Sequence, residues 1–165
     1  MYSVSHDGSN RKVLWQELLR HEFEAALEQA PVVILPVGSV EQHGPHCPCG
    51  DDDFNAIGMA ELISKKTGVM LLPCPMYGSH PYHHWKMPGN IPLTYETHIA
   101  LLMDIVRGAS HAGYNKFIIL SAHGQVSSTI VAVPHLFWQT GKGQMQIPLP
   151  EPAQRQRAVV HCRAP

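Results

Sequence analysis

The sequence contains no uninterrupted run of about 18 apolar residues, the length that a membrane-spanning helix needs. Its N-terminal stretch, MYSVSHDGSNRK, also lacks the apolar segment of a secretory signal peptide. Together these absences predict a chain that does not enter a membrane and is not exported. We therefore expect the protein in the cytoplasm.

An excess of positive charge is missing as well. Lys and Arg number 12 and Asp and Glu number 13, so the formal net charge is −1 at pH 7. Such a chain has no overall positive field with which to collect phosphates. In addition, no GxGxxG or GxxxxGK[ST] motif follows an expected strand. We expect neither nucleic acid nor a nucleotide as a partner.

Cysteine is scarce, whereas histidine is abundant. The four cysteines form no CxxC pair, and we interpret them as small apolar fillers or free thiols, with no disulfide and no cysteine zinc site. The 12 histidines lie mostly in Gly/Pro-rich stretches. Loops of that kind are where ligands and substrate contacts are usually found.

The spacing of apolar residues predicts alternating helices and strands in one domain. Residues 14–30, 54–67 and 95–111 repeat apolar positions every three or four residues, which is typical of amphipathic helices. The runs at 31–37, 69–77 and 116–120 are short and apolar, and the first is rich in β-branched residues, which indicates buried strands. This alternation favours an α/β fold of three layers, αβα, in which helices cover both faces of a mostly parallel sheet.

The pattern changes near residue 133. Residues 134–165 carry five of the 14 prolines and show no sustained period. We expect residues 1–133 to form the metal-binding α/β domain and residues 134–165 to form a poorly ordered tail, with Pro134 interrupting any helix. The strand that ends at Leu120, or its neighbour, would then be left as an uncovered edge.

Acidic and imidazole side chains follow two of the expected strands. Glu41, His43, His46 and Asp52 come after the first strand, and His123 follows the third. Because ligands bind at the carboxyl ends of parallel strands, we expect these residues to converge. They are ligand types for Zn²⁺ or Mn²⁺, and Asp52 is the candidate to bridge two ions. The alternative is a surface loop whose Asp and His residues are only solvated.

Further histidines are candidates for contact with a substrate. The segment SHPYHH places three of them on one loop, and we select His83 and His84 there, together with His46, as catalytic candidates. The alternative is that they are ordinary exposed loop histidines. His98 and His111 lie on or beside a predicted helix, where we expect surface or capping residues.

The segment ILPVGSVEQHGPHCPCGDD resembles the signature of the creatininase family, in which Glu, His and Asp stand as they do at Glu41, His43 and Asp52. The similarity continues through MYGSHPYHH, MPGNIPLTYET and IILSAHGQ, so that it covers roughly residues 31–133. The combination of SHPYHH, MPG and SAHGQ is more similar to the branch of the family that hydrolyses inositol-derived cyclic ketones, the 3-dehydro-scyllo-inosose hydrolases.

The resemblance implies an αβα fold that assembles as a homo-oligomer, a hexamer in the family, with a binuclear Zn²⁺ or Mn²⁺ centre. One ion would take Glu41, Asp52 and His123. The other would take His43, the shared Asp52 and a carboxylate from elsewhere in the chain. The position two residues after the strand-end histidine is Gln125, which offers only a neutral oxygen.

Two functions follow from this resemblance. The first is a metal-dependent hydrolase that acts on a small cyclic amide or cyclic ketone through a metal-activated water. The family's later His/Gly/Glu-rich segment has no counterpart after Val133, so the fold is expected to be truncated at its C-terminal end. The second function is therefore an inactive fragment of such a hydrolase that binds a single ion or binds metal weakly.

Overall fold

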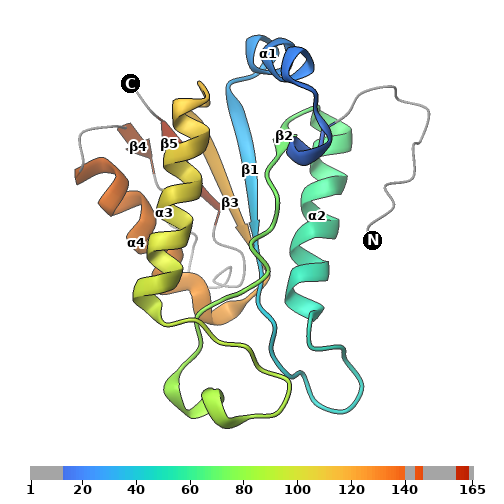
Figure 1. Cartoon of the computed structure of the whole chain (residues 1–165), viewed down its shortest axis with the longest axis vertical. Coiled ribbons are helices and arrows are strands. Elements are labelled where there is room, and N and C mark those ends of the chain that lie inside the picture. The colour runs from blue at the N-terminus through green and yellow to red at the C-terminus, as the bar shows by residue number, and fades with distance from the viewer. Residues whose placement is uncertain (1–12, 140–143, 147–158, 164–165) are drawn as a thin grey trace.

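The computed structural model describes residues 13–139, 144–146 and 159–163 of the chain. At its centre lies a five-stranded sheet of order β2-β1-β3-β5-β4 (Figure 1). The first three strands in that order are parallel: β1 (Val32–Val37) lies between β2 (Met70–Leu71) and β3 (Lys116–Ser121). β5 (Val159–Arg163) pairs with β3 in the antiparallel direction, and β4 (Gln144–Gln146) pairs with β5. The predicted α/β class is confirmed.

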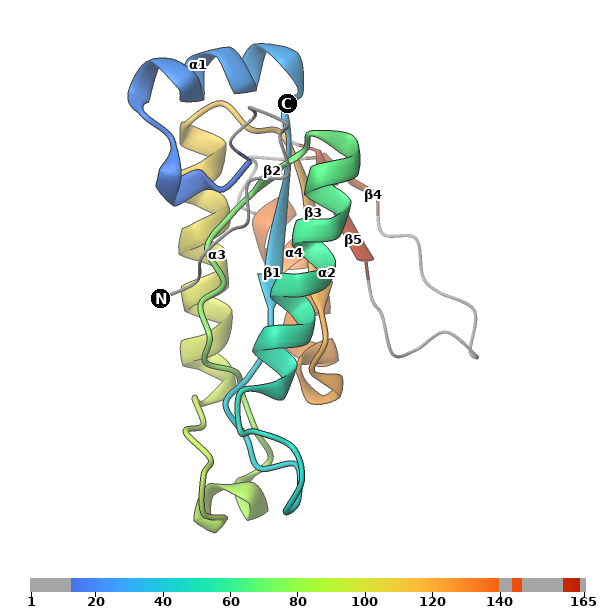
Figure 2. The same cartoon turned by 90° about the vertical axis from the view of Figure 1, so that its right-hand side faces the viewer.

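Helices cover both faces of the sheet, as Figure 2 shows with the sheet seen on edge. α2 (Asp51–Thr67) lies on one face, and α3 (Tyr95–His111) lies on the other, where it contacts α4 (Ser127–Gln139). α1 (Arg20–Gln29) lies across the amino ends of the strands (Figure 1). None of the helices in the described part of the chain has both the length and the apolar character needed to cross a bilayer.

The side chains of β1 point alternately to the two faces of the sheet and contribute to an apolar cluster on each face. Val33, Leu35 and Val37 belong to the apolar cluster on the α3 side, whereas Ile34 belongs to the cluster on the α2 side. Successive strand residues point to opposite faces, so a strand that is buried on both sides must be apolar throughout. All four side chains are fully buried, which fixes the register of the central strand.

Two helix ends follow the sequence closely. α2 ends at Gly68, which adopts a positive φ of 71° and donates its N–H to Ser64. α3 begins after Thr94, whose side-chain oxygen accepts from the backbone N–H of Thr97 at 3.2 Å. Both ends agree with the sequence prediction for these helices.

The first predicted helix is interrupted. Residues Trp15–Glu17 form a single 3₁₀ turn, η1, and the chain is extended at Leu18 and Leu19 before α1 starts. Leu14 forms an isolated parallel bridge with Leu71, at the edge of the sheet. Tertiary packing of the first residues against β2 thus replaces the continuous helix that the apolar spacing predicted.

The prediction that Pro134 interrupts any helix was wrong. Pro134 lies inside α4 and is buried, next to the fully buried Val133. Proline removes one helical hydrogen bond, and burial of this face against the sheet compensates for that loss. The expectation that β3 or its neighbour would be left as an uncovered edge was also wrong, because β5 pairs with β3, and β1 lies between β2 and β3.

The division of the chain at residue 133 stays a prediction, although α4 runs across that boundary. Within the expected tail, the structure describes the rest of α4 and the strands β4 and β5. Residues 140–143, 147–158 and 164–165, on which much of that expectation falls, lie outside the described residues.

Candidate metal centre

The predicted ligands lie at the carboxyl ends of the parallel strands. In Figure 1 these ends point downward, and the segments after β1 and β2 gather below them. Glu41 and His43 lie in the segment between β1 and α2, and His123 lies two residues after β3. Asp52 was expected in a loop, but it occupies the first turn of α2 and is buried. The helix therefore fixes the direction of the Asp52 carboxylate.

Four predicted ligands come together at this end of the sheet. His123 Nδ1 lies 2.8 Å from Asp52 Oδ2 and 3.1 Å from Glu41 Oε1. His43 Nε2 lies 3.3 Å from Asp52 Oδ1 and 4.0 Å from Glu41 Oε1. Glu41, His43 and Asp52 come from the continuous stretch that leads from β1 into α2, whereas His123 follows β3, so the parallel sheet brings these two parts of the chain together.

Two groups of three residues have their potential ligand atoms within 4.8 Å of one another. One group is Glu41, His43 and Asp52, and the other is Glu41, His80 and His123. Glu41 therefore belongs to both groups, whereas the sequence interpretation gave the shared position to Asp52. Asp52 still contacts both groups, because it approaches His43 as well as His123.

Backbone carbonyls orient two of the imidazole rings. His43 Nδ1 lies 3.1 Å from the carbonyl oxygen of Glu41, and His123 Nε2 lies 3.4 Å from that of Ser79. A carbonyl only accepts, so each of these nitrogens must donate its hydrogen. In the neutral ring the other nitrogen, which faces the carboxylates, then carries a lone pair. This arrangement is typical of histidines that bind metal ions.

The electrostatics of the cluster favour a cation. Burial lowers the pKa of His123, but the hydrogen bond with Asp52 and the charge of Glu41 outweigh it, so the net pKa is raised. Among the described residues, His80 Nδ1 is buried without a hydrogen-bond partner. Buried polar atoms of this kind need a partner. A mixed set of carboxylates and imidazoles fits Zn²⁺ or Mn²⁺.

The three catalytic candidates differ in their surroundings. His84 Nδ1 lies 3.6 Å from Glu41 Oε2, and the side chain is 20% exposed. His83 is exposed and packs edge-on against His84, with ring centroids 4.4 Å apart. His46 is exposed, and none of the contacts described for this part of the chain joins it to the candidate ligands. Only His84 is thus brought next to the cluster.

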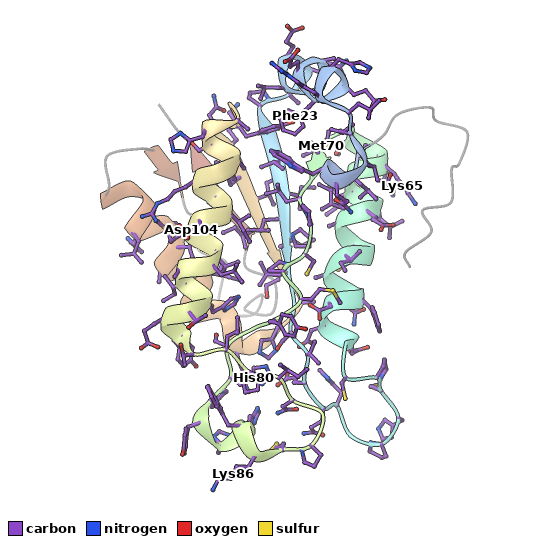
Figure 3. The ribbon with its side chains drawn as sticks, in the orientation of Figure 1. Phe23, Lys65, Met70, His80, Lys86 and Asp104 are labelled. Carbon is purple, nitrogen blue, oxygen red and sulfur yellow. The ribbon has the colours of Figure 1, made fainter. Side chains whose placement is uncertain are left out.

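Sequence reasoning did not select His80 as a candidate ligand. His80 is 2% exposed, and its Nδ1 lies 3.2 Å from Glu41 Oε2. Figure 3 shows His80 below the strands, where the loop segments gather. In the sequence it is one of three histidines on a polar loop, and no spacing rule separates a buried histidine from its exposed neighbours. Only the fold, which brings this loop under β1, distinguishes it.

The expectation that His98 is a surface or capping residue was wrong. His98 is fully buried, and its Nδ1 lies 3.3 Å from Ser79 Oγ. Burial, and then the charges of His123 and His80, lower the pKa of His98 to about 4. Its position four residues before the buried Leu102 places it on the apolar stripe of α3, a signal that the sequence contained.

Two glycines allow the segments around the cluster to pack closely. A Cβ at Gly38 would lie 2.6 Å from the backbone nitrogen of Asp53, and one at Gly78 would lie 2.8 Å from the carbonyl oxygen of Gly38. Asp53 itself is fully buried, and burial raises its pKa to about 6. This packing holds the first turn of α2, and with it Asp52, against the end of β1.

A cavity of 340 Å³ lies beside the cluster. It is bounded by the first turns of α2 and by the end of β3. Asp52 lines it together with Asn55, Met59 and Ser121. Its walls thus offer a carboxylate, an amide and a hydroxyl next to apolar surface, which suits a small polar molecule.

Comparisons with known proteins show which family this chain resembles. The family model described as "Creatininase: Creatinine amidohydrolase" matches residues 16–162. A 3-dehydro-scyllo-inosose hydrolase from Thermotoga maritima is 40% identical over 113 residues, which are 68% of this chain and 36% of that protein. A creatinine amidohydrolase from Pseudomonas putida is 27% identical over 129 residues, which are 74% of this chain and 49% of that protein.

Solved structures give the same result at the level of the fold. A creatinine amidohydrolase matches with a TM-score of 0.71 at 25% identity, over 78% of this chain and 53% of that chain. A mutant creatininase of Zn-Zn type matches with a TM-score of 0.72 at 25% identity, over 79% of this chain and 54% of that one. The chain spans only about a third to a half of the length of the curated relatives named above.

Proposed function

The chain belongs to the creatininase family, and we propose that it is a metal-dependent hydrolase of a small cyclic substrate. Within that proposal the substrate is a cyclic amide or an inositol-derived cyclic ketone. The relative with 40% identity carries the name of an inosose hydrolase, which favours the cyclic ketone. A cytoplasmic location and assembly into a homo-oligomer are further parts of the proposal.

One observation supports the proposal above all others. Glu41, His43 and Asp52, which follow β1, meet His123, which follows β3, and their approach distances of 2.8–4.0 Å suit ligands around a common cation. A solvated surface loop, the alternative interpretation, would leave such side chains in water. Asp52 and His123 are instead 6% and 3% exposed. Burying them without a cation would be costly.

The chain's own residues divide into three tasks. Glu41, His43, Asp52 and His123 would hold Zn²⁺ or Mn²⁺, which when bound supplies a Lewis acid for a carbonyl oxygen and lowers the pKa of a nearby water. His84, partly exposed beside Glu41, would move a proton between the centre and the substrate. Asn55 and Ser121 would orient the substrate in the adjoining cavity.

The size of that cavity is compatible with a small substrate. At 340 Å³ it lies near the lower end of the range of about 300–1,000 Å³ for small-molecule sites. A single ring with a few polar substituents fits this space better than an extended chain does. This argument favours a cyclic amide or an inosose over a peptide, although peptidases occur among the relatives.

The second candidate is an inactive fragment with weak or single-ion binding. It is supported by the neutral Gln125, where the family resemblance implies a carboxylate, and by the limited share of its relatives that the chain covers. After metal loading, the active hydrolase should turn over substrate, whereas the inactive fragment should not. The fragment should also retain fewer ions.

Metal loading followed by a substrate screen tests the proposal. The metal-free protein is incubated with Mn²⁺ or Zn²⁺, dialysed, and measured for bound metal and for hydrolysis of creatinine and of inososes. We expect retained metal and turnover of one of these compounds. Asp52→Asn should abolish turnover, whereas His111→Gln, at the exposed end of α3, should match the wild type. Retained metal without turnover of either compound would favour the inactive fragment.

A further inference from the structure

We propose that His80 is a metal ligand, and that it forms a two-histidine, one-glutamate set with His123 and Glu41. This inference rests on the proposed function, because it assigns a ligand in the same centre. It adds a residue that neither the motif nor the family resemblance marked, since the resemblance implied Glu41, Asp52 and His123 for one ion and His43 with Asp52 for the other.

The position of His80 carries the inference. Its Nδ1 lies 3.2 Å from Glu41 Oε2, and its ring centroid lies 5.3 Å from that of His123. The potential ligand atoms of Glu41, His80 and His123 all lie within 4.8 Å of one another. Three atoms at such separations can surround one ion with bonds of about 2.0–2.2 Å.

The burial of His80 leaves its Nδ1 in need of a partner. The side chain is fully shielded from water, and within the described residues no group forms a hydrogen bond with this nitrogen. A buried polar nitrogen without a partner costs free energy. The atom lies 3.2 Å from Glu41 Oε2, on the side of the candidate centre, so a cation there would supply the missing partner.

The opposite side of the ring is held by other groups. His80 Nε2 is hydrogen-bonded with the buried hydroxyl of Ser39, and the indole Nε1 of Trp85 donates to the backbone carbonyl of His80 at 3.3 Å. When Nε2 donates to Ser39, the lone pair of the neutral ring is on Nδ1 and faces Glu41. His43 and His123 are held in the same way, each by a partner on the nitrogen that faces away from the carboxylates.

The resulting ligand set suits catalysis. Two histidines and one glutamate form a known type of catalytic zinc site, in which the fourth position stays open for water or substrate. All three residues lie in the described part of the chain. The set does not require a carboxylate at position 125, which in this chain is Gln125. His80 would thus add a third protein ligand to the ion position of Glu41 and His123, which is separate from the position of His43 that residue 125 would complete.

Another role for His80 would be to hold Glu41 in place as a protonated ring without touching the ion. The two roles differ in where Nδ1 lies when metal is present. Crystals of the wild-type protein soaked in Mn²⁺ or Zn²⁺, with anomalous diffraction at the metal edge, separate them. We expect an ion within about 2.0–2.2 Å of His80 Nδ1, Glu41 and His123. An ion on Glu41 and His123 with His80 outside bonding distance would overturn the inference.

Titration of Zn²⁺ into His80→Gln gives an independent measurement. Loss of a ligand should weaken binding by at least about 100-fold, the upper end of the effect expected for residues that only support a ligand. His111→Gln removes an exposed histidine and should bind like the wild type. Unchanged affinity in a folded His80→Gln variant would contradict the inference, and if that variant does not fold, the wild-type crystals decide.

The outcomes also separate this inference from the proposed function. Ligation by His80 in a protein that turns over neither creatinine nor an inosose would leave the inference standing and remove the function. Turnover in a protein whose ion avoids His80 would do the reverse.

Discussion

His123 Nδ1 lies 2.8 Å from Asp52 Oδ2, and this contact joins the end of β3 to the first turn of α2. Both side chains are buried, and α2 packs against the sheet on the face opposite to α3. The centre is therefore built on two rigid elements. A substitution that shifts either element should disturb metal binding before it unfolds the protein.

Glu41→Gln should remove nearly all bound metal, because Glu41 is the one residue common to both three-residue groups. His43→Gln should leave the group of Glu41, His80 and His123 intact, and about half of the metal should be retained. Elemental analysis after dialysis measures both. If Asp52→Ala empties the centre and Glu41→Gln does not, then Asp52 is the shared ligand, as the sequence interpretation had it.

His98 should make the protein less stable as the pH falls. Its pKa in the folded chain is about 4, below the ordinary value of 6.5, so the unfolded chain binds more protons between these values. The stabilisation is fully present above pH 6.5 and is lost as the pH falls toward 4, by about 3 kcal/mol in total. In urea unfolding between pH 7 and 4, the free energy of unfolding of His98→Leu should depend less on pH than that of the wild type.

The matched control for this titration is His111→Leu, which removes an exposed histidine of the same helix. It should keep the wild-type pH dependence. If His98→Leu and the wild type lose stability in parallel as the pH falls, His98 does not carry the effect.

Gly38→Ala should destabilise the protein by about 2–3 kcal/mol and lower its metal affinity. The added Cβ would lie 2.6 Å from the backbone of Asp53, which cannot move without displacing the first turn of α2. Gly58→Ala is the matched control, since a Cβ there meets nothing within 4 Å and alanine favours the helix by about 1 kcal/mol. Thermal unfolding and Zn²⁺ titration report the two effects, and equal behaviour of both variants would contradict the close packing at Gly38.

Gln125→Glu should raise the affinity for Mn²⁺, by about tenfold or more, because it places a charge where the neutral amide now lies. The Oε1 atom of Gln125 is buried without a hydrogen-bond partner among the described residues. A carboxylate there is costly when no ion is present, so the variant should be less stable than the wild type without metal and at least as stable with it. Calorimetric titration and melting with and without Mn²⁺ measure this, and an unchanged affinity would place residue 125 outside the centre.

The alternation of helix and strand was determined by sequence patterns of short range. Thr94 and Gly68 mark helix ends through local hydrogen bonds and a positive φ, and β1 is apolar because both of its faces are buried. Such signals need no knowledge of the rest of the fold. The same is true of the motif that contains Glu41, His43 and Asp52, whose residue types already indicated a metal centre.

Only the tertiary structure decided which histidines lie at the candidate centre. His80 and His83 are three positions apart in one loop, yet one is buried against Glu41 and the other is exposed. Likewise, the burial of Pro134 in α4 and the pairing of β5 with β3 depend on surfaces formed by distant segments. The sequence by itself determined the elements and the ligand types, because these depend on neighbouring residues. The ligand set depends on how the segments after β1, β2 and β3 meet, and that is fixed only when the sheet is assembled.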